Sequence, residues 1–350
     1  MKRGNNMAVV MVTGGSGLIG SNVTRELVKE GHKVVLVDNR RDTRLIPDLV
    51  DSIEMIPADI LDLASLIEIM GDLKVERVIH MAAIMGSWYD THPIMCYQVD
   101  LGGTLNVLEA ARANHVKRVV LGSTRGVIGK VEGTKYGYPT YDPVNEDYIG
   151  PRRPLSVMKV ACEFMGLIYS RNQWVDTAAL RFGDIYCPER LVKGAQVQAS
   201  VFTDMILNAY LGRPTDITSS GDEMIDPIYA KDCAHAVVLA CFAENLKHRI
   251  YNIGSGHGII IREAAAVIKN VFSNAVINFG TGFFTFAQGM DANYCVLDIS
   301  RAKEDLRFKP SYSLEDGIKD FVNHIESFRK HGVDLLGGQP TYTTEYTRKQ

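Results

Sequence analysis

The stretch VVMVTGGSGLIG, residues 9–20, constrains the fold of this chain more than any other. It begins with a short apolar run typical of a buried parallel strand, and residues 21–29 after it have helical spacing. Between the two lie four glycines, at Gly14, Gly15, Gly17 and Gly20. A strand that turns into a helix through glycines brings backbone N–H groups close to a bound pyrophosphate. The stretch therefore predicts a dinucleotide-binding site.

The context of this glycine motif makes the prediction specific. A GxGxxG pattern is weak evidence alone, but here it follows a strand and opens a helix. A second apolar strand, residues 33–37, ends at Asp38, eighteen residues after Gly20. An acidic residue at that place accepts hydrogen bonds from the adenosine ribose hydroxyls. The first forty residues thus form one complete strand–helix–strand unit.

Strands and helices alternate through the first half of the chain. We expect strands at 53–57, 77–81, 116–121 and 177–182, and helices at 63–70, 102–114 and 155–171. The alternation predicts an α/β fold with a Rossmann-type, doubly wound parallel sheet. Right-handed crossovers then place the carboxyl ends of the strands along one edge, where ligands bind.

The regular alternation ends after Pro188, where helices are expected near 196–211, 232–243, 262–272 and 313–329. We therefore expect residues 1–188 to form mainly the dinucleotide-binding domain. Residues 189–336 would form mainly a smaller, interleaved substrate-binding lobe, with the chain crossing back to the sheet. Residues 337–350 read as a C-terminal tail.

Composition and charge exclude several classes of function. Hydrophobic residues at 46% and charged residues at 23% are typical of a globular protein, and a net charge of −3 predicts neither nucleic-acid nor membrane binding. The six cysteines are scattered without a CxxC pair or a Cys/His cluster, which predicts no metal site and a reducing compartment. With no signal peptide expected before the first strand and no apolar run of membrane-spanning length, we predict a cytoplasmic protein.

Further short motifs extend along most of the chain. They are TGGSGLIG (13–20), VDN (37–39), ADI (58–60), HMAA (80–83), GGTLNVLEAAR (102–112), YAKDCAHA (229–236) and YNIGSG (251–256). With these motifs the sequence resembles the NAD-dependent epimerase/dehydratase family, the extended short-chain dehydrogenase/reductases, over residues 7–330. The resemblance implies an NAD-dependent enzyme with a small-molecule substrate. It also implies a homodimer formed through helices 103–114 and 155–171, and the apolar character of the second helix supports this independently.

The resemblance also implies roles for individual residues. At the pyrophosphate the cofactor would contact Gly14, Gly17, Leu18, Ile19 and Gly20. Asp38 and Asn39 would bind the adenosine ribose, and Asp59 and Ile60 would contact the adenine. Lys159 would bind the nicotinamide ribose, and the remaining cofactor contacts would be Met81, Ala82, Ala83 and Tyr186. Thr124 would hold the reacting oxygen, so Thr124 and Lys159 are the predicted catalytic residues. The acidic residue at position 38 favours NAD over NADP, even though Arg40 and Arg41 follow it.

The chain departs from the family pattern at its proton-transfer residue. The family places a catalytic tyrosine four residues before the lysine, and here that position is Leu155. Three routes remain open: Lys159 itself acts, no proton transfer is needed there, or another tyrosine reaches in from the irregular segment 129–154. The tyrosines in question are Tyr136, Tyr138, Tyr141 and Tyr148.

Other positions bear on the substrate. Ser123 and Arg125 flank Thr124 as possible helpers, and Arg125, with Arg152 and Arg153, offers guanidinium groups suited to a carboxylate or phosphate. The family's asparagine before GGT is Asp100, which we expect to be structural, like His80. Ile225 stands where the family often has an arginine that binds a nucleotide phosphate, which weakens a nucleotide-sugar interpretation.

These observations predict an NAD-dependent enzyme acting on a hydroxylated carbon of a small polar substrate, either sugar-like or anionic. The reaction would be an oxidation, an epimerisation, or an oxidation-assisted elimination or carbon–carbon step. Because of Leu155, two alternatives remain open. One is a non-redox lyase or isomerase that retains NAD, and the other is a catalytically silent NAD-binding sensor or scaffold.

Overall fold

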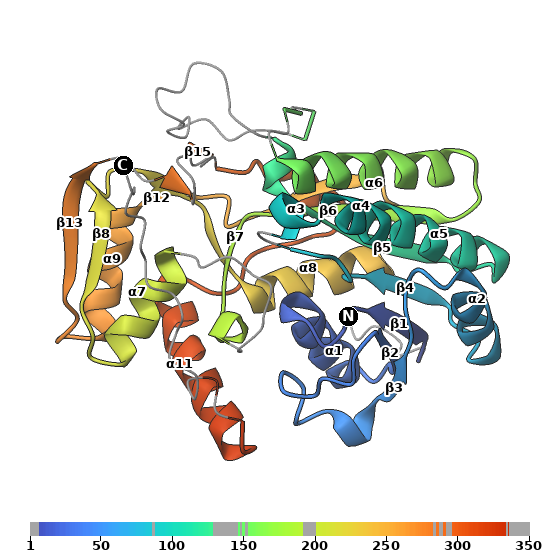
Figure 1. Cartoon of the computed structure of the whole chain (residues 1–350), viewed down its shortest axis with the longest axis horizontal. Helices are drawn as coiled ribbons and strands as arrows, with labels where there is room; N and C mark the ends of the chain where they lie inside the picture. Colours follow the sequence, from blue (N-terminus) through green and yellow to red (C-terminus); the bar gives the residue numbers. More distant parts are fainter. Residues whose placement is uncertain are drawn as a thin grey trace.

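A seven-stranded parallel sheet forms the centre of the fold in the computed structural model (Figure 1). The structure describes residues 7–85, 88–128, 146–147, 149–150, 153–191, 201–282, 285–286, 290–291, 296–333 and 335. The strands lie in the order β11-β6-β5-β4-β1-β2-β3. Their bounds are β1 Val9–Thr13, β2 Lys33–Asp38, β3 Glu54–Pro57, β4 Arg77–His80, β5 Arg118–Thr124, β6 Asp176–Phe182 and β11 Ile250–Ile253. All six neighbouring pairs are parallel, which confirms the predicted Rossmann-type sheet.

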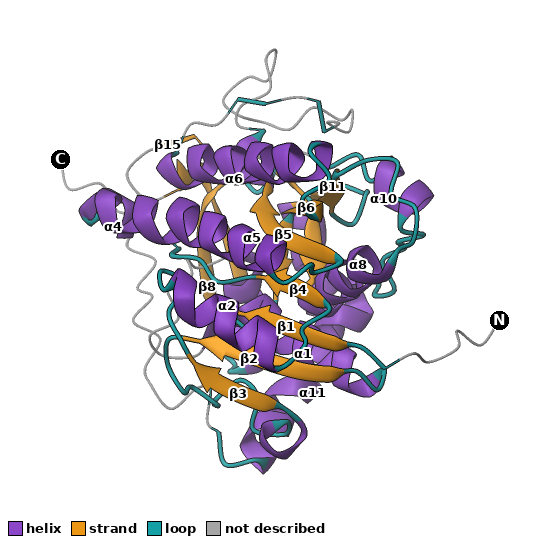
Figure 2. Cartoon of the chain, turned by 90° about the vertical axis from the view of Figure 1, so that its right-hand side faces the viewer, coloured by secondary structure: helices purple, strands orange, loops and turns teal. Residues whose placement is uncertain are grey.

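Helices cover both faces of this sheet (Figure 2). One face carries α2 (Leu63–Asp72), α5 (Gly103–Ala113) and α6 (Pro154–Arg171), and the other carries α1 (Leu18–Lys29) and α8 (Ala230–Phe242). The side chains of β1 alternate between them, with Met11 in the core under α2, α5 and α6 and its neighbours Val10 and Val12 in the core under α1 and α8. Because both faces are buried, the strand is a continuous apolar run rather than an alternating one.

A nearly continuous helical segment connects β4 to the helix layer. It consists of α3 (Trp88–Thr91), α4 (Pro93–Tyr97), a π-helical turn η2 (Gln98–Gly102) and α5. Short 3₁₀ turns also occur at η1 (Val50–Ser52), η3 (Arg125–Val127) and η5 (Pro188–Leu191). A π-helical turn such as η2 is rare, and turns of this kind occur often at functional sites.

A smaller lobe lies at the carboxyl edge of the sheet (Figure 1). Its helices are α7 (Val201–Tyr210), α9 (Ile261–Val271) and α11 (Leu314–Lys330), whereas α10 (Ser300–Asp305) packs beside β11 of the central sheet. Its paired strands are β7 (Asp184–Tyr186) with β10 (Pro227–Tyr229), β8 (Thr215–Ser219) with β13 (Ile277–Gly282), β9 (Met224–Ile225) with β12 (Ile259–Ile260), and β14 (Thr285–Phe286) with β15 (Met290–Asp291). Since β11 belongs to the central sheet, the chain crosses back between the two parts; the boundaries at 188 and 336 stay a prediction.

One difference from the expected elements affects the site. The strand expected at 116–121 runs from Arg118 to Thr124, and it pairs with β6 as far as Thr124 opposite Phe182. The predicted catalytic hydroxyl is therefore placed by sheet pairing and not by a loop. Among the helices that the structure describes, none is long and apolar enough to cross a membrane.

Candidate active site

The glycine turn after β1 is shaped by close backbone contacts. Gly14 has φ +65°, and a Cβ there would lie 2.5 Å from the Ala82 nitrogen. A Cβ at Gly20 would lie 2.1 Å from the Gly14 carbonyl oxygen, so α1 begins directly against the turn. The Gly17 N–H donates to the Gly14 carbonyl at 3.0 Å, which closes the turn. Only glycine fits at Gly14 and Gly20, and the N-terminus of α1 faces the sheet edge as an anion site requires.

The acidic residue after β2 lies beside this turn. The Asp38 carboxylate is half-buried and accepts a hydrogen bond from the Ser16 hydroxyl within the turn. Asn39 and Asp59 are exposed, and the Asp59 carboxylate accepts a hydrogen bond from the Leu61 N–H at 2.9 Å. Asp38, predicted to bind the ribose, and Asp59, predicted to contact the adenine, thus lie at or just after the ends of the paired strands β2 and β3, at the edge that carries the glycine turn.

The other predicted cofactor contacts divide into edge and core positions. Met81, Ala82 and Ala83 are half-buried, and the Met81 N–H donates to the Thr13 carbonyl at 3.0 Å, which keeps this segment against the glycine turn. Ile60 is buried instead, where a Cβ at Gly103 would lie 2.4 Å from its Cδ1. Leu18 and Ile19, which are predicted pyrophosphate contacts, are partly buried against the core under α1 and α8.

Tyr186 occupies a core position between the sheet and the smaller lobe. It is 2% exposed, its ring contacts the rings of Phe202 and Tyr229, and a Cβ at Gly317 would lie 1.8 Å from its hydroxyl. Burial raises the pKa of this phenol, so it stays protonated. Its cofactor role stays a prediction, and its packing is that of a structural side chain.

Thr124 and Ser123 have different surroundings at the end of β5. The Thr124 hydroxyl is half-buried and accepts a hydrogen bond from the Gly126 N–H at 3.1 Å. The Ser123 hydroxyl donates to Glu163 at 2.5 Å, and Glu163 forms a buried two-point ion pair with Arg181 at 2.9 and 2.7 Å. Thr124 therefore remains near the edge of the sheet, whereas Ser123 belongs to a buried polar network that joins β5, β6 and α6.

Arg125 is paired within the protein. Its guanidinium lies 2.6 Å from the Asp184 carboxylate, and both side chains are largely buried. Burial raises the pKa of Asp184, and the Arg125 charge opposes that shift. The sequence alone did not reveal this partner, because β7 begins far from β5 along the chain. Any substrate anion at Arg125 would compete with Asp184.

Lys159 lies on the inner side of α6. It is 9% exposed, and Leu155, one helical turn before it on the same side, is half-buried. His80 bonds to the Thr13 hydroxyl at 2.6 Å through Nδ1 and to the Thr104 hydroxyl at 3.1 Å through Nε2. Burial, together with the Lys159 charge, lowers the pKa of His80 to about 3. This histidine is an uncharged structural residue, in line with its expected role.

Asp100 is buried, in line with the structural role expected from the sequence. It lies inside the π turn η2 and is 1% exposed. Its carboxylate accepts hydrogen bonds from the Ile84 N–H at 2.7 Å and from the Tyr89 hydroxyl. Burial raises the pKa of Asp100, whereas the Lys159 charge and these two donors oppose that shift. Sequence reasoning missed Tyr89, since nothing in the motif spacing points to it.

Several predicted helpers lie outside the described residues. They are Tyr136, Tyr138, Tyr141, Tyr148 and Arg152.

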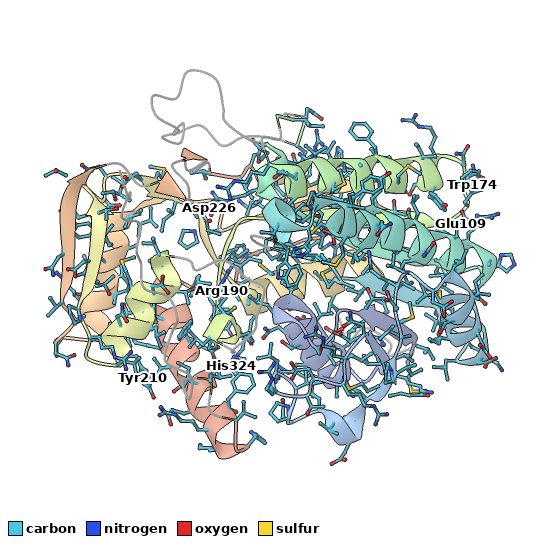
Figure 3. All side chains as sticks on the ribbon, in the orientation of Figure 1. Glu109, Trp174, Arg190, Tyr210, Asp226 and His324 are labelled. Carbon is cyan, nitrogen blue, oxygen red and sulfur yellow. The ribbon has the colours of Figure 1, made fainter. Side chains whose placement is uncertain are left out.

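Within the part of the chain that the structure describes, no group of three His, Cys, Asp or Glu side chains is arranged to hold a metal ion. Arg190 and Asp226 lie where the smaller lobe meets the sheet (Figure 3). Asp226 is fully buried and accepts hydrogen bonds from the N–H groups of Ser255 and Leu297, so its role is to join loops.

The parallel sheet, the glycine turn and the acidic residue at the next strand end define a dinucleotide-binding protein of the Rossmann class. The NAD dependent epimerase/dehydratase family matches residues 10–254, and the chain belongs to this family.

Comparisons with individual proteins agree with this family. A putative UDP-glucose 4-epimerase of Methanocaldococcus jannaschii is 30% identical over 91% of this chain and 99% of its own. A UDP-N-acetyl-alpha-D-glucosaminuronate decarboxylase of Bacillus cytotoxicus is 29% identical over 89% of this chain and 96% of its own. The crystal structure of the Thermotoga maritima UDP-glucose 4-epimerase with UDP-glucose is 25% identical, with a TM-score of 0.77 over 91% of this chain and 99% of that one. An NAD-dependent enzyme of the epimerase/dehydratase type is the class that these matches support.

Proposed function

We propose that this enzyme binds NAD at the glycine turn and oxidises a hydroxylated carbon of a nucleotide-activated sugar, with return of the hydride after epimerisation or a carbon–carbon step. The observation that carries the proposal is the backbone contact at Gly14 and Gly20, which leaves no room for side chains beside Asp38. The relatives named above are UDP-sugar epimerases and a decarboxylase, which supports the substrate class. With Ile225 in place of an arginine, other residues must bind the phosphates.

The residues of the chain divide the work as follows. When bound, NAD supplies a hydride acceptor. The N-terminus of α1 would bind the pyrophosphate, and Asp38 would accept hydrogen bonds from the adenosine ribose. The Thr124 hydroxyl would orient the reacting oxygen, and the Lys159 ammonium would bind the nicotinamide ribose. Leu155 has no proton to transfer, so the acid or base is a different group.

The first test is to denature the purified protein and identify any released nucleotide. One NAD or NADH per chain would support a resident cofactor, whereas a protein that binds neither nucleotide, even when it is added, would refute the proposal. The loaded protein is then mixed with UDP-glucose, and reduced nicotinamide absorbance is followed in a single turnover. Thr124→Ala and Lys159→Ala are expected to lower that signal at least tenfold, in line with the loss of a positioned catalytic group.

A second candidate function follows from Leu155. A non-redox lyase or isomerase would keep NAD bound without reducing it, and the half-buried leucine where the family has a phenol favours it. Transient reduced nicotinamide on substrate addition would exclude this candidate. Leu155→Tyr provides the matched variant, because it restores the family's phenol. If it creates ordinary dehydrogenase activity, the remainder of the site is competent for hydride transfer.

The proposed partner is a second copy of the chain. Helix α6 exposes an apolar stripe, Val157, Phe164 and Ile168, whereas Val160, Met165 and Tyr169 of the same helix pack against the core. The neighbouring α4 exposes Ile94 and Tyr97, and α4, α5 and α6 lie on the same face (Figure 2). Beyond the end of α6, Trp174 lies near Glu109 of α5 (Figure 3). An apolar patch of this kind is typical of a homodimer interface.

A further inference from the structure

We propose that Glu163 is a positioning residue, and that its bonds to β5 and β6 fix where α6 presents Lys159 to the cofactor. The inference rests on the proposed function, in which the Lys159 ammonium binds the nicotinamide ribose. Glu163 is not a catalytic residue, because it acts only through the helix that it shares with Lys159. The proposed reaction itself leaves this buried carboxylate unused.

Helix α6 begins beside the predicted catalytic hydroxyl. A Cβ added at Gly126 would lie 2.5 Å from the Ser156 hydroxyl oxygen and 3.4 Å from the Thr124 hydroxyl oxygen, so the first turn of α6 lies against the end of β5. Lys159 follows Ser156 by three residues, and Glu163 follows Lys159 by four, so these side chains share one side of the helix. All three are buried. The side of α6 that faces the sheet therefore carries both the ammonium and the carboxylate.

Two neighbouring strands bind the Glu163 carboxylate at once. Ser123 and Arg181 lie opposite each other in the pairing of β5 with β6. One carboxylate oxygen accepts from the Ser123 hydroxyl at 2.5 Å and from the Arg181 Nε at 2.9 Å, and the other accepts from the Arg181 Nη2 at 2.7 Å. The Arg181 Nη1 donates to the Glu146 carbonyl at 2.8 Å, so the guanidinium is itself held in place. A planar two-point contact of this kind fixes orientation as well as distance.

Helix α6 does not need an ion pair merely to stay on the sheet. It also contacts the sheet at Gly166, where a Cβ would lie 2.9 Å from the Leu121 side chain and the Thr177 hydroxyl donates to the Gly166 carbonyl at 2.8 Å. Burying the charges of Glu163 and Arg181 costs desolvation that well-packed apolar side chains would avoid. Apolar burial is non-directional, however, whereas hydrogen bonds to two strands set direction as well as distance. The desolvation cost is explained if the placement of α6 matters for cofactor binding.

Ser123→Ala tests the proposal, because it removes the bond to β5 and leaves the ion pair intact. The measurement is the rate at which bound NADH leaves the loaded protein after mixing with excess NAD⁺, followed by nicotinamide fluorescence. Lys159→Ala should raise this rate at least about tenfold, and Ser123→Ala about fivefold, because the ammonium is displaced from the ribose. In the Lys159→Ala background, Ser123→Ala should change the rate by less than about twofold, since the group that it acts through is gone.

The matched control is Thr177→Val, which removes a different hydrogen bond between α6 and the sheet. Thr177 and Ser123 are both buried, and each variant removes one hydroxyl that binds α6. The Thr177 contact reaches α6 at Gly166, which lies seven residues after Lys159. We therefore expect Thr177→Val to leave the rate of NADH release within about twofold of the unmodified value.

A second variant decides the question if Ser123→Ala fails to fold. Glu163→Leu combined with Arg181→Met removes both charges together, so neither charge is left buried alone. We expect this double variant to release NADH on the order of tenfold faster than the unmodified protein, and to lose that difference in the Lys159→Ala background.

The outcomes keep the two proposals apart. If the unmodified protein binds neither nucleotide, the proposed function is wrong and this inference fails with it. If NADH binds, but Ser123→Ala and the double variant release it at the unmodified rate, Glu163 does not position Lys159. An equal acceleration with and without Lys159 would indicate a general loosening of the fold and would overturn the inference. An acceleration by Thr177→Val as large as that by Ser123→Ala would overturn it too, because the effect would then be unspecific.

Discussion

At the scale of single residues, Gly14 shows how backbone conformation and contact act together. Gly14 and Gly212 have nearly equal φ values, +65° and +66°. A Cβ added at Gly212 would have no neighbour within 4 Å, whereas a Cβ added at Gly14 would collide with the Ala82 backbone. We expect Gly212→Ala to cost about 1–2 kcal/mol of unfolding free energy, from the conformation alone. Gly14→Ala should cost at least about 3 kcal/mol and weaken NAD binding. Urea unfolding measures both, and equal losses would contradict the contact argument.

His80 is expected to make stability depend on pH. Its folded pKa of about 3 lies below the unfolded value near 6.5, so the unfolded chain binds more protons between these pH values. Stability contributed by neutral His80 is therefore present above pH 6.5 and is lost as the pH falls toward 3. Between pH 7 and 5 the protein should lose about 2 kcal/mol more than the His80→Gln variant. Denaturant titrations of both proteins at pH 7 and pH 5 measure this difference, and equal losses of unfolding free energy in the two proteins would argue against it.

At the scale of elements, a buried arginine caps the end of α8. Arg118 on β5 donates to the carbonyls of Ala240 and Ala243 and forms an ion pair with Asp176 at 2.7 Å. Arg118→Met would leave these acceptors buried without a donor, so we expect it to cost about 3 kcal/mol of unfolding free energy. The adjacent Lys117 forms an exposed pair with Glu76, and Lys117→Met should cost less than about 1 kcal/mol. Thermal and urea unfolding of both variants distinguish the two cases.

At the scale of the whole molecule, the apolar stripe on α6 predicts a homodimer. Phe164 is 49% exposed at the centre of the stripe. Phe164→Glu would place a charge in the interface between two copies, so we expect a monomer at micromolar concentration with little loss of folding stability. Val276→Glu alters an equally exposed side chain in the smaller lobe and should leave the dimer intact. Light scattering during size-exclusion chromatography measures both, and a monomeric unmodified protein would refute the assembly.

Much of the fold was predictable from local sequence. The glycine turn, Asp38 and the apolar strands carry their signal within a few residues, because turn conformation and burial on both faces restrict which residues fit. The Rossmann sheet, the approximate strand and helix positions and the family followed from that signal. The position of Leu155 before Lys159 was also visible, since both belong to one helix.

The tertiary structure alone decided which polar side chains meet around the site. Arg125 faces Asp184, Ser123 faces Glu163, and Asp100 faces Tyr89, and none of these pairs shares a motif. These polar groups meet only when strand order and helix packing bring their segments together, and burial then decides how strong each hydrogen bond or ion pair is. Local residue patterns therefore determined the cofactor-binding framework, whereas long-range packing determined the electrostatics around Thr124 and Lys159.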